Sequence, residues 1–518
     1  MYPSDYIKSV YKKHVTSADK VTFIAVVIIG LISHMYMMTN KLPNYDDIKG
    51  MINDYGAGFE SGRWALSVIG VFVKRTIGSY SVPWLYGMVS IAFVGIAAVL
   101  VIRLLDIRDS MLCFLTGGLM VSFPAVTGIM FFMYTAPYYC LALTFSAAAV
   151  LMCKKRKCGA VSYICAMIFL AAAVGIYQAY LPLCAALCLT ALIKECLGES
   201  DWKVILKDGF QFFFVLLGGM IFYFVMVKLS LTIMNTQLTE YQGIDKMGHL
   251  DIMQLPSLIG IAYKKYFDLF FGIVPGVNFY PIVRLAITAL QIITVASVCF
   301  ILKKKGKGTV VWLETIGLMI LFPLSINSIY IMAPYGTVYI IMLYSVVAMY
   351  LLNITVMQVL KDIKYVGVIG IASHWFHTFL IIIILLSQCQ YNNVQYLAMD
   401  MECRQAESYF TTLVTRIKSA EGYKSSMPIV FIGDEIKDDT FDNLSDFHQY
   451  GLGGRSDSLL NIYSRNFFLN RYLGFSADII TDDGSRSIAP EVSGMPCYPD
   501  EGSIQVIDNE VVVKLQSI

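Results

Sequence analysis

The chain has 518 residues, of which 57% are hydrophobic and only 15% carry a charge. Soluble domains carry about 25% charged residues, so this composition excludes an ordinary soluble protein and predicts a membrane protein. The formal net charge is +2, and without a basic stripe or tail the sequence gives no support for a nucleic-acid partner.

The first predicted element is a transmembrane helix over residues 21–38, after a polar and basic stretch of about twenty residues. No small-residue cleavage site follows it, so it is expected to stay in the mature protein. Further apolar runs predict the other spans, with Pro124 and Pro323 interrupting the third and the ninth. About eleven transmembrane helices are expected, at 21–38, 83–102, 109–124, 137–153, 159–176, 179–195, 210–230, 281–302, 308–330, 337–353 and 365–388.

Lys and Arg concentrate in alternate connections between these runs. Short basic connections stay on the cytoplasmic side of a membrane. The basic residues concerned are Lys8, Lys12, Lys13, Lys20, Arg103, Arg108, Lys154, Lys155, Arg156, Lys157, Lys194, Lys203, Lys207, Lys303, Lys304, Lys305, Lys307, Lys361 and Lys364. This pattern predicts a multi-pass protein of the cell membrane with a cytoplasmic N-terminus. Three long segments, 39–82, 231–280 and 389–518, then lie outside, where the chemistry is expected because long loops are usually functional.

The first outer segment carries two adjacent acids and an arginine. Asp46 and Asp47 follow the first span directly, and Arg63 comes 16 residues after Asp47. A carboxylate can accept the proton of an acceptor hydroxyl, and the guanidinium fork suits a phosphate. The alternative interpretation is that these acids are simply solvated.

Two short outer turns are rich in hydrogen-bonding side chains. Tyr134 and Tyr138 belong to the first turn, and Tyr177 and Gln178 to the second. Aromatic faces and amide side chains often hold sugars. These residues, together with Glu60 of the first outer segment, are therefore predicted to bind a transferred sugar or its acceptor. Aromatic residues that only anchor the chain at the interface are the alternative.

The second outer segment contains an amphipathic stretch from Leu255 to Phe271. Lys264 and Lys265 lie on it, where they could contact a lipid phosphate. Lysines that extend to the interface and only anchor the helix are the alternative.

The last 130 residues, 389–518, are predicted to form a separate small α/β domain outside the membrane, after a transmembrane core of residues 1–388. Residues 396–420 have helical periodicity, Pro428 to Gly433 reads as a buried strand, and residues 503–515 read as a hairpin. The Gly-rich stretch 451–455 lacks the strand that a nucleotide-binding loop needs. Without a nucleotide motif, an activated sugar is expected to arrive on a lipid.

In layout the chain resembles the glucosyltransferase II type of bacterial and phage membrane proteins, which modify surface polysaccharides. The resemblance rests on the following residues: Asp46-Asp47, Gly62-Arg63-Trp64, Tyr134 to Tyr139, Tyr177-Gln178 and Pro428 to Asp434. It implies a GT-C-like fold, mainly α, with the active site on the outer face. It also implies a glucose or related hexose donor on undecaprenyl phosphate, and a cell-surface glycan as the acceptor.

The resemblance further implies that Asp46 or Asp47 is the catalytic base. It leads us to expect a basic residue after the ninth span, but Met332 to Gly336 contains none. The candidates to bind the donor phosphate are therefore Arg63, Lys264, Lys265 and Arg284, in that order.

The expected reaction is an inverting hexosyl transfer, in which Asp46 or Asp47 acts as base and Arg63 stabilises the phosphate. The two acids could also hold a divalent metal ion. A lipid-linked sugar transporter or flippase is one alternative, although it calls for repeats or intramembrane charges that the sequence lacks. A non-catalytic scaffold that binds glycan is the other.

Overall fold

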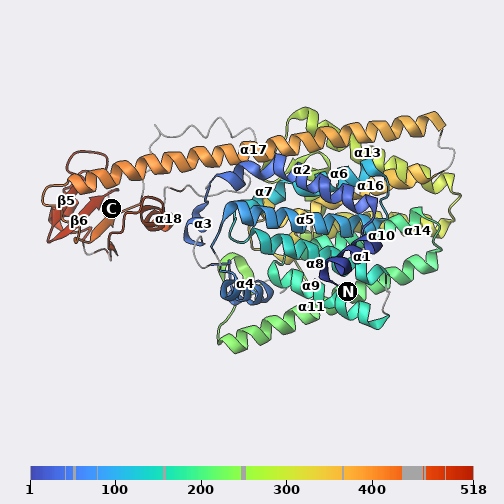
Figure 1. Ribbon diagram of the computed structural model, residues 1–518, viewed down its shortest axis with the longest axis horizontal. Coiled ribbons are helices and arrows are strands. Elements are labelled where there is room, and N and C mark those ends of the chain that lie inside the picture. The colour runs from blue at the N-terminus through green and yellow to red at the C-terminus, as the bar shows by residue number, and fades with distance from the viewer. Residues whose placement is uncertain are drawn as a thin grey trace.

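A computed structural model describes residues 2–40, 42–50, 54–78, 80–155, 159–246, 252–363, 367–434, 459, 462–482, 484 and 486–516. The protein is a bundle of long helices packed along one axis, with a small unit containing strands beyond one end (Figure 1). The prediction of a mainly α, polytopic protein with a small C-terminal α/β part is confirmed.

Twelve helices of the described ranges build the bundle. They are α2 (Ser17–Thr39), α5 (Pro83–Leu105), α6 (Ser110–Ser122), α7 (Pro124–Met130), α8 (Ala136–Lys155), α9 (Ala160–Ile176), α10 (Tyr180–Leu197), α11 (Trp202–Met234), α13 (Pro281–Lys304), α14 (Thr309–Ile326), α16 (Val347–Asp362) and α17 (Gly367–Ser419). Nine helices within the described ranges can cross a membrane by length and composition, or ten if the bent pair α6 and α7 is one span. Pro124 begins α7 and explains the 44° bend, because proline supplies no N–H to continue the preceding helix.

Each of the eleven predicted spans overlaps a helix of this bundle. The α9 helix has only 17 residues, but it packs between α8 and α11. The predicted tenth span, 337–353, is displaced: the helical span there runs from Tyr344 to Asp362. Residues 333–343 form turns instead, including the short 3-10 helix η3 (Ile340–Met342).

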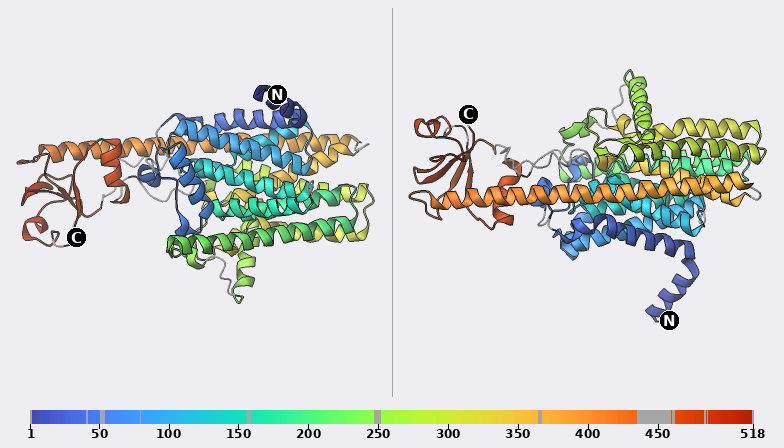
Figure 2. Two further views of the ribbon diagram at one scale, coloured as in Figure 1. Left: turned by 60° about the horizontal axis from the view of Figure 1, so that its bottom comes forward. Right: turned by 90° about the horizontal axis from the view of Figure 1, so that it is seen from above.

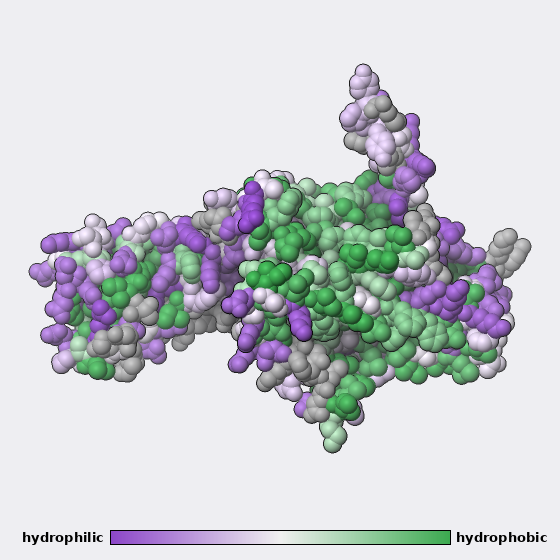
Figure 3. Space-filling model, turned by 90° about the horizontal axis from the view of Figure 1, so that it is seen from below, coloured by the Kyte–Doolittle hydropathy of each residue, from purple (hydrophilic) through white to green (hydrophobic). Residues whose placement is uncertain are grey.

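The outer surface of the bundle is apolar, as contact with lipid requires. Figure 3 shows hydrophobic side chains over the bundle, with hydrophilic ones gathered on the C-terminal unit and towards the far end. On α11 the exposed apolar side chains include Phe213, Phe214, Leu217, Ile221 and Phe224.

The predicted amphipathic stretch from Leu255 to Phe271 and the segment that follows Arg63 both form helices that do not run with the bundle. The α4 helix (Trp64–Thr76) is seen end-on in Figure 1, and α12 (Leu255–Phe270) projects sideways in the right-hand view of Figure 2. The N-terminal helix α1 (Pro3–His14) also turns away from the bundle axis. After α12, a tight hairpin of β1 (Ile273–Val274) and β2 (Val277–Asn278) leads into α13.

The end of the bundle that carries the C-terminal strands is called the sheet end, and the other is called the basic end. The basic connections meet at the basic end, where several bridge neighbouring segments. Arg103 pairs with Asp19 at 2.7 Å, and Lys194 pairs with Asp106 at 2.7 Å. Arg156, Lys157 and Lys364 lie outside the described residues.

The α17 helix joins the bundle to the C-terminal unit without a break. It has 53 residues and passes through residue 388, where the sequence predicted a domain boundary. Its first part packs on α2 and α13, and its last part projects beyond the bundle in both views of Figure 2. The predicted helix over 396–420 is therefore the end of the last span rather than a separate element.

The C-terminal unit contains a four-stranded sheet in the order β4-β3-β6-β5. The strands are β3 (Ile429–Ile432), β4 (Ile479–Thr481), β5 (Ile504–Ile507) and β6 (Glu510–Lys514). The predicted strand and hairpin are confirmed: β3 is fully buried, and β5 and β6 pair antiparallel across Asp508 and Asn509. Both turn residues have positive φ, 48° and 63°, as a two-residue hairpin turn requires.

The described part of this unit also contains three short helices: α18 (Ile462–Phe467), η7 (Phe468–Tyr472) and α19 (Pro490–Ser493). Its core packs Phe410 of α17 against Phe468 and strand β6. The Gly-rich stretch 451–455 lies outside the described residues.

Candidate active site

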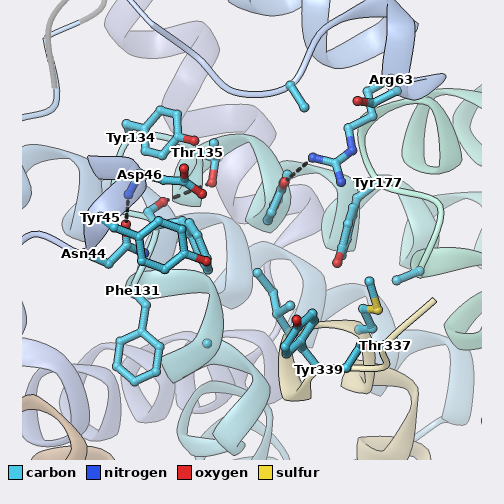
Figure 4. A pocket seen from close by; sticks show the side chains of 18 of the residues that line it. Asn44, Tyr45, Asp46, Arg63, Phe131, Tyr134, Thr135, Tyr177, Thr337 and Tyr339 are labelled. Carbon is cyan, nitrogen blue, oxygen red and sulfur yellow. Dashed lines mark hydrogen bonds between the residues drawn. The ribbon is translucent and has the colours of Figure 1, made fainter. Parts of the chain in front are cut away.

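A cavity of about 400 Å³ lies at the sheet end of the bundle, between segments that are far apart in sequence. Its walls come from the connection between α2 and α4, the turns after α7 and α9, residues 329–342, α17 and Leu459. Figure 4 shows several of the side chains that line it. The polar lining residues include Asn44, Tyr45, Asp46, Arg63, Tyr134, Thr135, Tyr139, Tyr177, Gln178, Thr337, Tyr339 and Glu402.

Asn44 builds the corner that carries the two predicted acids. Its Oδ1 accepts the backbone N–H of Asp46 and of Asp47, each at 2.8 Å. An asparagine that accepts such bonds starts a helix, here the short α3 (Tyr45–Gly50). Successive residues of a helix point about 100° apart, so the two carboxylates cannot face the same space.

Asp46 is the acid that lines the cavity. Its carboxylate lies on the opposite side of the cavity from the guanidinium of Arg63 (Figure 4). The hydroxyl of Tyr463 donates a hydrogen bond to Asp46 Oδ1 at 3.1 Å.

Asp47 instead holds α3 against the bundle. Its carboxylate is buried, with Oδ2 accepting the N–H of Met133 at 3.1 Å and Oδ1 that of Tyr134 at 3.2 Å. Burial raises the pKa of Asp47 to about 8, although these two N–H groups favour the charged form. Asp47 does not line the cavity, so the structure assigns the two acids different environments.

Replacing Asp47 by asparagine is expected to change how stability depends on pH. The variant loses one of two accepting oxygens, so we expect it to unfold at a lower temperature than the native protein at pH 5. The folded-state pKa of Asp47 is raised, so its stabilising contribution is full below the unfolded pKa of about 4 and is lost as pH rises through about 8. The difference in Tm, measured in detergent from pH 5 to pH 9, should therefore narrow with rising pH. A difference that stays constant with pH would contradict this account of Asp47.

Arg63 lies at the start of α4 and is surrounded by tyrosines. Its Nη1 donates to the hydroxyl of Tyr139 at 2.9 Å, and its guanidinium lies 4.9 Å from the ring centre of Tyr177. The rings of Tyr139 and Tyr177 stack on each other at 4.7 Å. Arg63 Nε is buried without a hydrogen-bond partner, and Arg63 forms no ion pair with a described residue. A cation without a counter-charge in a cavity is suited to binding an anion.

The turn that leads into Arg63 is held by Gln178. Its Nε2 donates to the carbonyl of Ser61 at 2.7 Å and lies 3.3 Å from the hydroxyl of Tyr223. Gly62 has a φ of +68°, and a Cβ there would lie 2.9 Å from the same hydroxyl. Glycine therefore suits both the backbone conformation and the close packing that aim Arg63 into the cavity.

The remaining predicted residues divide into two groups. Tyr134, Tyr177 and Gln178 line the cavity with Asp46 and Arg63. The others, which do not line it, are Glu60, Tyr138, Lys264, Lys265 and Arg284.

Among the residues outside the cavity, Glu60, Lys265 and Arg284 have polar partners elsewhere. Glu60 accepts a hydrogen bond from Thr236 at 3.0 Å, and Tyr138 is buried within the bundle. Lys265 lies 3.7 Å from Asp268 on α12, and Arg284 donates to Asn278 at 2.7 Å.

Several lining residues were not predicted from the sequence. Tyr139 binds Arg63, and Tyr339 belongs to the turns before α16. Glu402 of α17 also lines the cavity, and its Oε1 accepts the N–H of Leu459 at 3.2 Å. The run Pro334-Tyr335-Gly336, which interrupts two apolar stretches, is a sequence signal for the turns, but nothing local marks Glu402.

The arrangement of donors does not suit a metal ion shared by Asp46 and Asp47. Both oxygens of Asp47 accept backbone N–H groups, and only Asp46 lines the cavity. Within the part of the chain that the structure describes, no group of three or more His, Cys, Asp or Glu side chains could hold a metal ion.

The fold and the cavity define a multi-pass membrane protein with a polar, aromatic site at one end of its helical bundle. The family model for GtrII glucosyl transferases matches residues 35–352, more than half of the chain. The chain belongs to this family and is a membrane glycosyltransferase. No curated protein and no solved structure matches it.

The matched region covers most of the cavity. It contains α3, Arg63, the two tyrosine-bearing turns and residues 329–342. Three lining residues lie beyond its end: Met399, Glu402 and Leu459.

Proposed function

We propose that this enzyme transfers glucose, or a related hexose, from a polyprenyl-phosphate donor to a cell-surface glycan on the outer face of the cell membrane. Undecaprenyl phosphate is the proposed carrier lipid. The observation that carries the proposal is the placement of Asp46 and Arg63 across one cavity, at the end of a membrane-spanning bundle (Figure 4).

The proposed chemistry is a single displacement with inversion. The acceptor hydroxyl attacks the anomeric carbon and gives its proton to the Asp46 carboxylate. The bond between the anomeric carbon and the phosphate oxygen breaks, and the lipid phosphate leaves with both electrons of that bond. Arg63 stabilises the leaving phosphate, whose charge increases as the bond breaks.

The cavity lining suits both parts of such a donor, the sugar and the lipid. Tyrosine hydroxyls and Gln178 offer hydrogen-bond partners to a sugar, and Asp46 lies among them. Apolar side chains of the same cavity, Ile329, Ile341 and Met342, suit the isoprenoid units next to the phosphate.

The orientation of the enzyme follows from the distribution of basic residues. Short connections rich in Lys and Arg meet at the basic end, and the cytoplasmic side retains such connections. We therefore place the N-terminus in the cytoplasm, with the cavity outside. The C-terminal unit, which we propose to be a domain and call the C-terminal domain below, also lies outside. Family membership favours an enzyme over the transporter and scaffold alternatives.

One experiment tests donor and orientation together. Sealed right-side-out vesicles from cells expressing the protein would receive purified surface polysaccharide, which cannot cross the membrane. Their membranes would contain polyprenyl-phosphate glucose labelled in the sugar. We expect label to pass to the polysaccharide, whereas externally added UDP-glucose gives no transfer in vesicles without the lipid donor. Transfer only in inverted vesicles, or only with the nucleotide sugar, would contradict the proposal.

A further inference from the structure

The short helix α3, which carries Asp46, is held between two parts of the molecule. On one side Asp47 accepts hydrogen bonds from the turn after α7, which belongs to the bundle. On the other side Ile48 is fully buried in the core of the C-terminal domain, together with Phe410 and Phe468. The position of α3 therefore depends on both parts.

Further contacts tie α3 to the C-terminal domain. Arg471 donates to the carbonyl of Ile48 at 2.7 Å and also to that of Lys49. These carbonyls lie at the end of α3, where helix carbonyls lack internal partners and a cation is favourable. Asn44 lies at the start of α3, and Arg471 therefore stabilises the other end of this helix.

The α18 helix adds a contact to the acid itself. Its Tyr463 packs edge-to-face on Tyr45 at 6.2 Å between ring centres, and Lys49 Nζ lies 5.4 Å from the Tyr463 ring centre. In this position the Tyr463 hydroxyl reaches Asp46 Oδ1. Partial burial and the Asp46 carboxylate raise the pKa of Tyr463 to about 12, so the hydroxyl stays protonated and donates.

The C-terminal domain also completes the wall of the cavity. Leu459, shortly before α18, lines it and donates its N–H to Glu402. None of Glu402, Leu459 and Tyr463 lies within the region that the family model matches.

From these contacts we propose that the C-terminal domain is part of the active site, and that Tyr463 is a positioning residue for the Asp46 carboxylate. The inference rests on the proposed function, because it takes Asp46 to be the base. A hydrogen bond to one carboxylate oxygen fixes the carboxylate plane and stabilises its charged form. The domain thereby controls the geometry and protonation of a base that it does not itself contain.

The test is Tyr463→Phe in the purified full-length protein, assayed with polyprenyl-phosphate glucose and surface polysaccharide from pH 5 to pH 9. Loss of the donor disfavours the charged carboxylate, so the acid limb of kcat/KM should move to higher pH by about one unit. At neutral pH we expect kcat/KM to fall about 10-fold, with little change in the KM for donor. Among the described residues, the other titratable groups near the Asp46–Tyr463 pair are Tyr45, Tyr134, Asp47, Lys49 and Asp54, and the substitution leaves all of them in place.

A matched control is Tyr80→Phe, which removes the hydroxyl of an exposed tyrosine outside the cavity lining. It should leave the pH profile unchanged. An unmoved acid limb in Tyr463→Phe would overturn the positioning role, whether or not the rate falls. The Asp46→Asn variant in the same assay distinguishes the two proposals. If Asp46→Asn is inactive, an unmoved acid limb contradicts only the role of Tyr463. If Asp46→Asn is fully active, the proposed function itself is wrong.

Discussion

Replacing Asp46 by asparagine is expected to lower kcat by at least about 100-fold, because the transition state loses its general base. The amide keeps the size of the side chain and can still accept from Tyr463, so folding should be preserved. Binding of the donor should change little, since the phosphate is assigned to Arg63. Initial rates of transfer from polyprenyl-phosphate glucose, at saturating donor, measure the effect.

The control for this variant is Asp54→Asn in the same outer segment. Asp54 does not line the cavity, and its Oδ1 accepts the N–H groups of Tyr55 and Gly56, as an amide oxygen also can. We expect its rate to stay within about two-fold of the native rate, in line with a small surface effect. Full activity in Asp46→Asn, or inactivity confined to Asp54→Asn, would show that Asp46 is not the base.

The second large effect is expected at Arg63. Changing it to lysine keeps the charge, but a lysine cannot present a planar fork and cannot keep the same contacts with Tyr139 and Tyr177. We expect kcat/KM to fall about 100-fold for Arg63→Lys, and further for Arg63→Gln, because charge on the leaving phosphate is then less well stabilised.

A comparison with Arg75→Lys separates this effect from a general loss of charge or stability. Arg75 is exposed near the end of the same helix, α4, and does not line the cavity. Its variant should transfer at the native rate. If Arg63→Lys is equally active, the phosphate is bound elsewhere, and Arg284, Lys264 and Lys265 become the residues to test.

Much of the site could be predicted from the first outer segment alone. Two acids just beyond a span and an arginine further on were expected to act together, and Asp46 and Arg63 do line one cavity. The difference between Asp46 and Asp47 could not be predicted. It depends on the rotation of α3, which the N–H groups of Met133 and Tyr134 set from 86 and 87 residues away.

The continuous α17 illustrates a different limit. Asn392, Asn393 and Gln395 interrupt the apolar pattern after the last predicted span, which indicated a boundary near residue 388. In the structure Asn392 donates to the carbonyl of Ser122, and Asn393 to that of Ile32. Both amides donate hydrogen bonds to neighbouring helices, so the helix continues through this polar stretch, and only tertiary contacts reveal it.

The span predicted over 337–353 was misplaced for a similar reason, because residues 333–343 form part of the cavity wall and not a membrane helix. Its residues are apolar enough to suggest a span, and hydropathy alone does not distinguish a buried turn from a membrane helix. The chain there is protected by the surrounding helices, which allows irregular backbone at this depth.

The length of α17 has a consequence for how this protein can vary. Because α17 is one continuous helix of 53 residues, each residue inserted into it would move the C-terminal unit by about 1.5 Å along the helix axis and rotate it by about 100°. A loop would absorb such a change, but here a single insertion near residue 400 would swing Tyr463 away from Asp46. Substitutions along the exposed face are tolerated more readily than changes of length, and an insertion of seven residues, close to two full turns, would restore the angle but not the height. In homologues that keep this helix, we therefore expect its residue count to be more strictly preserved than its sequence.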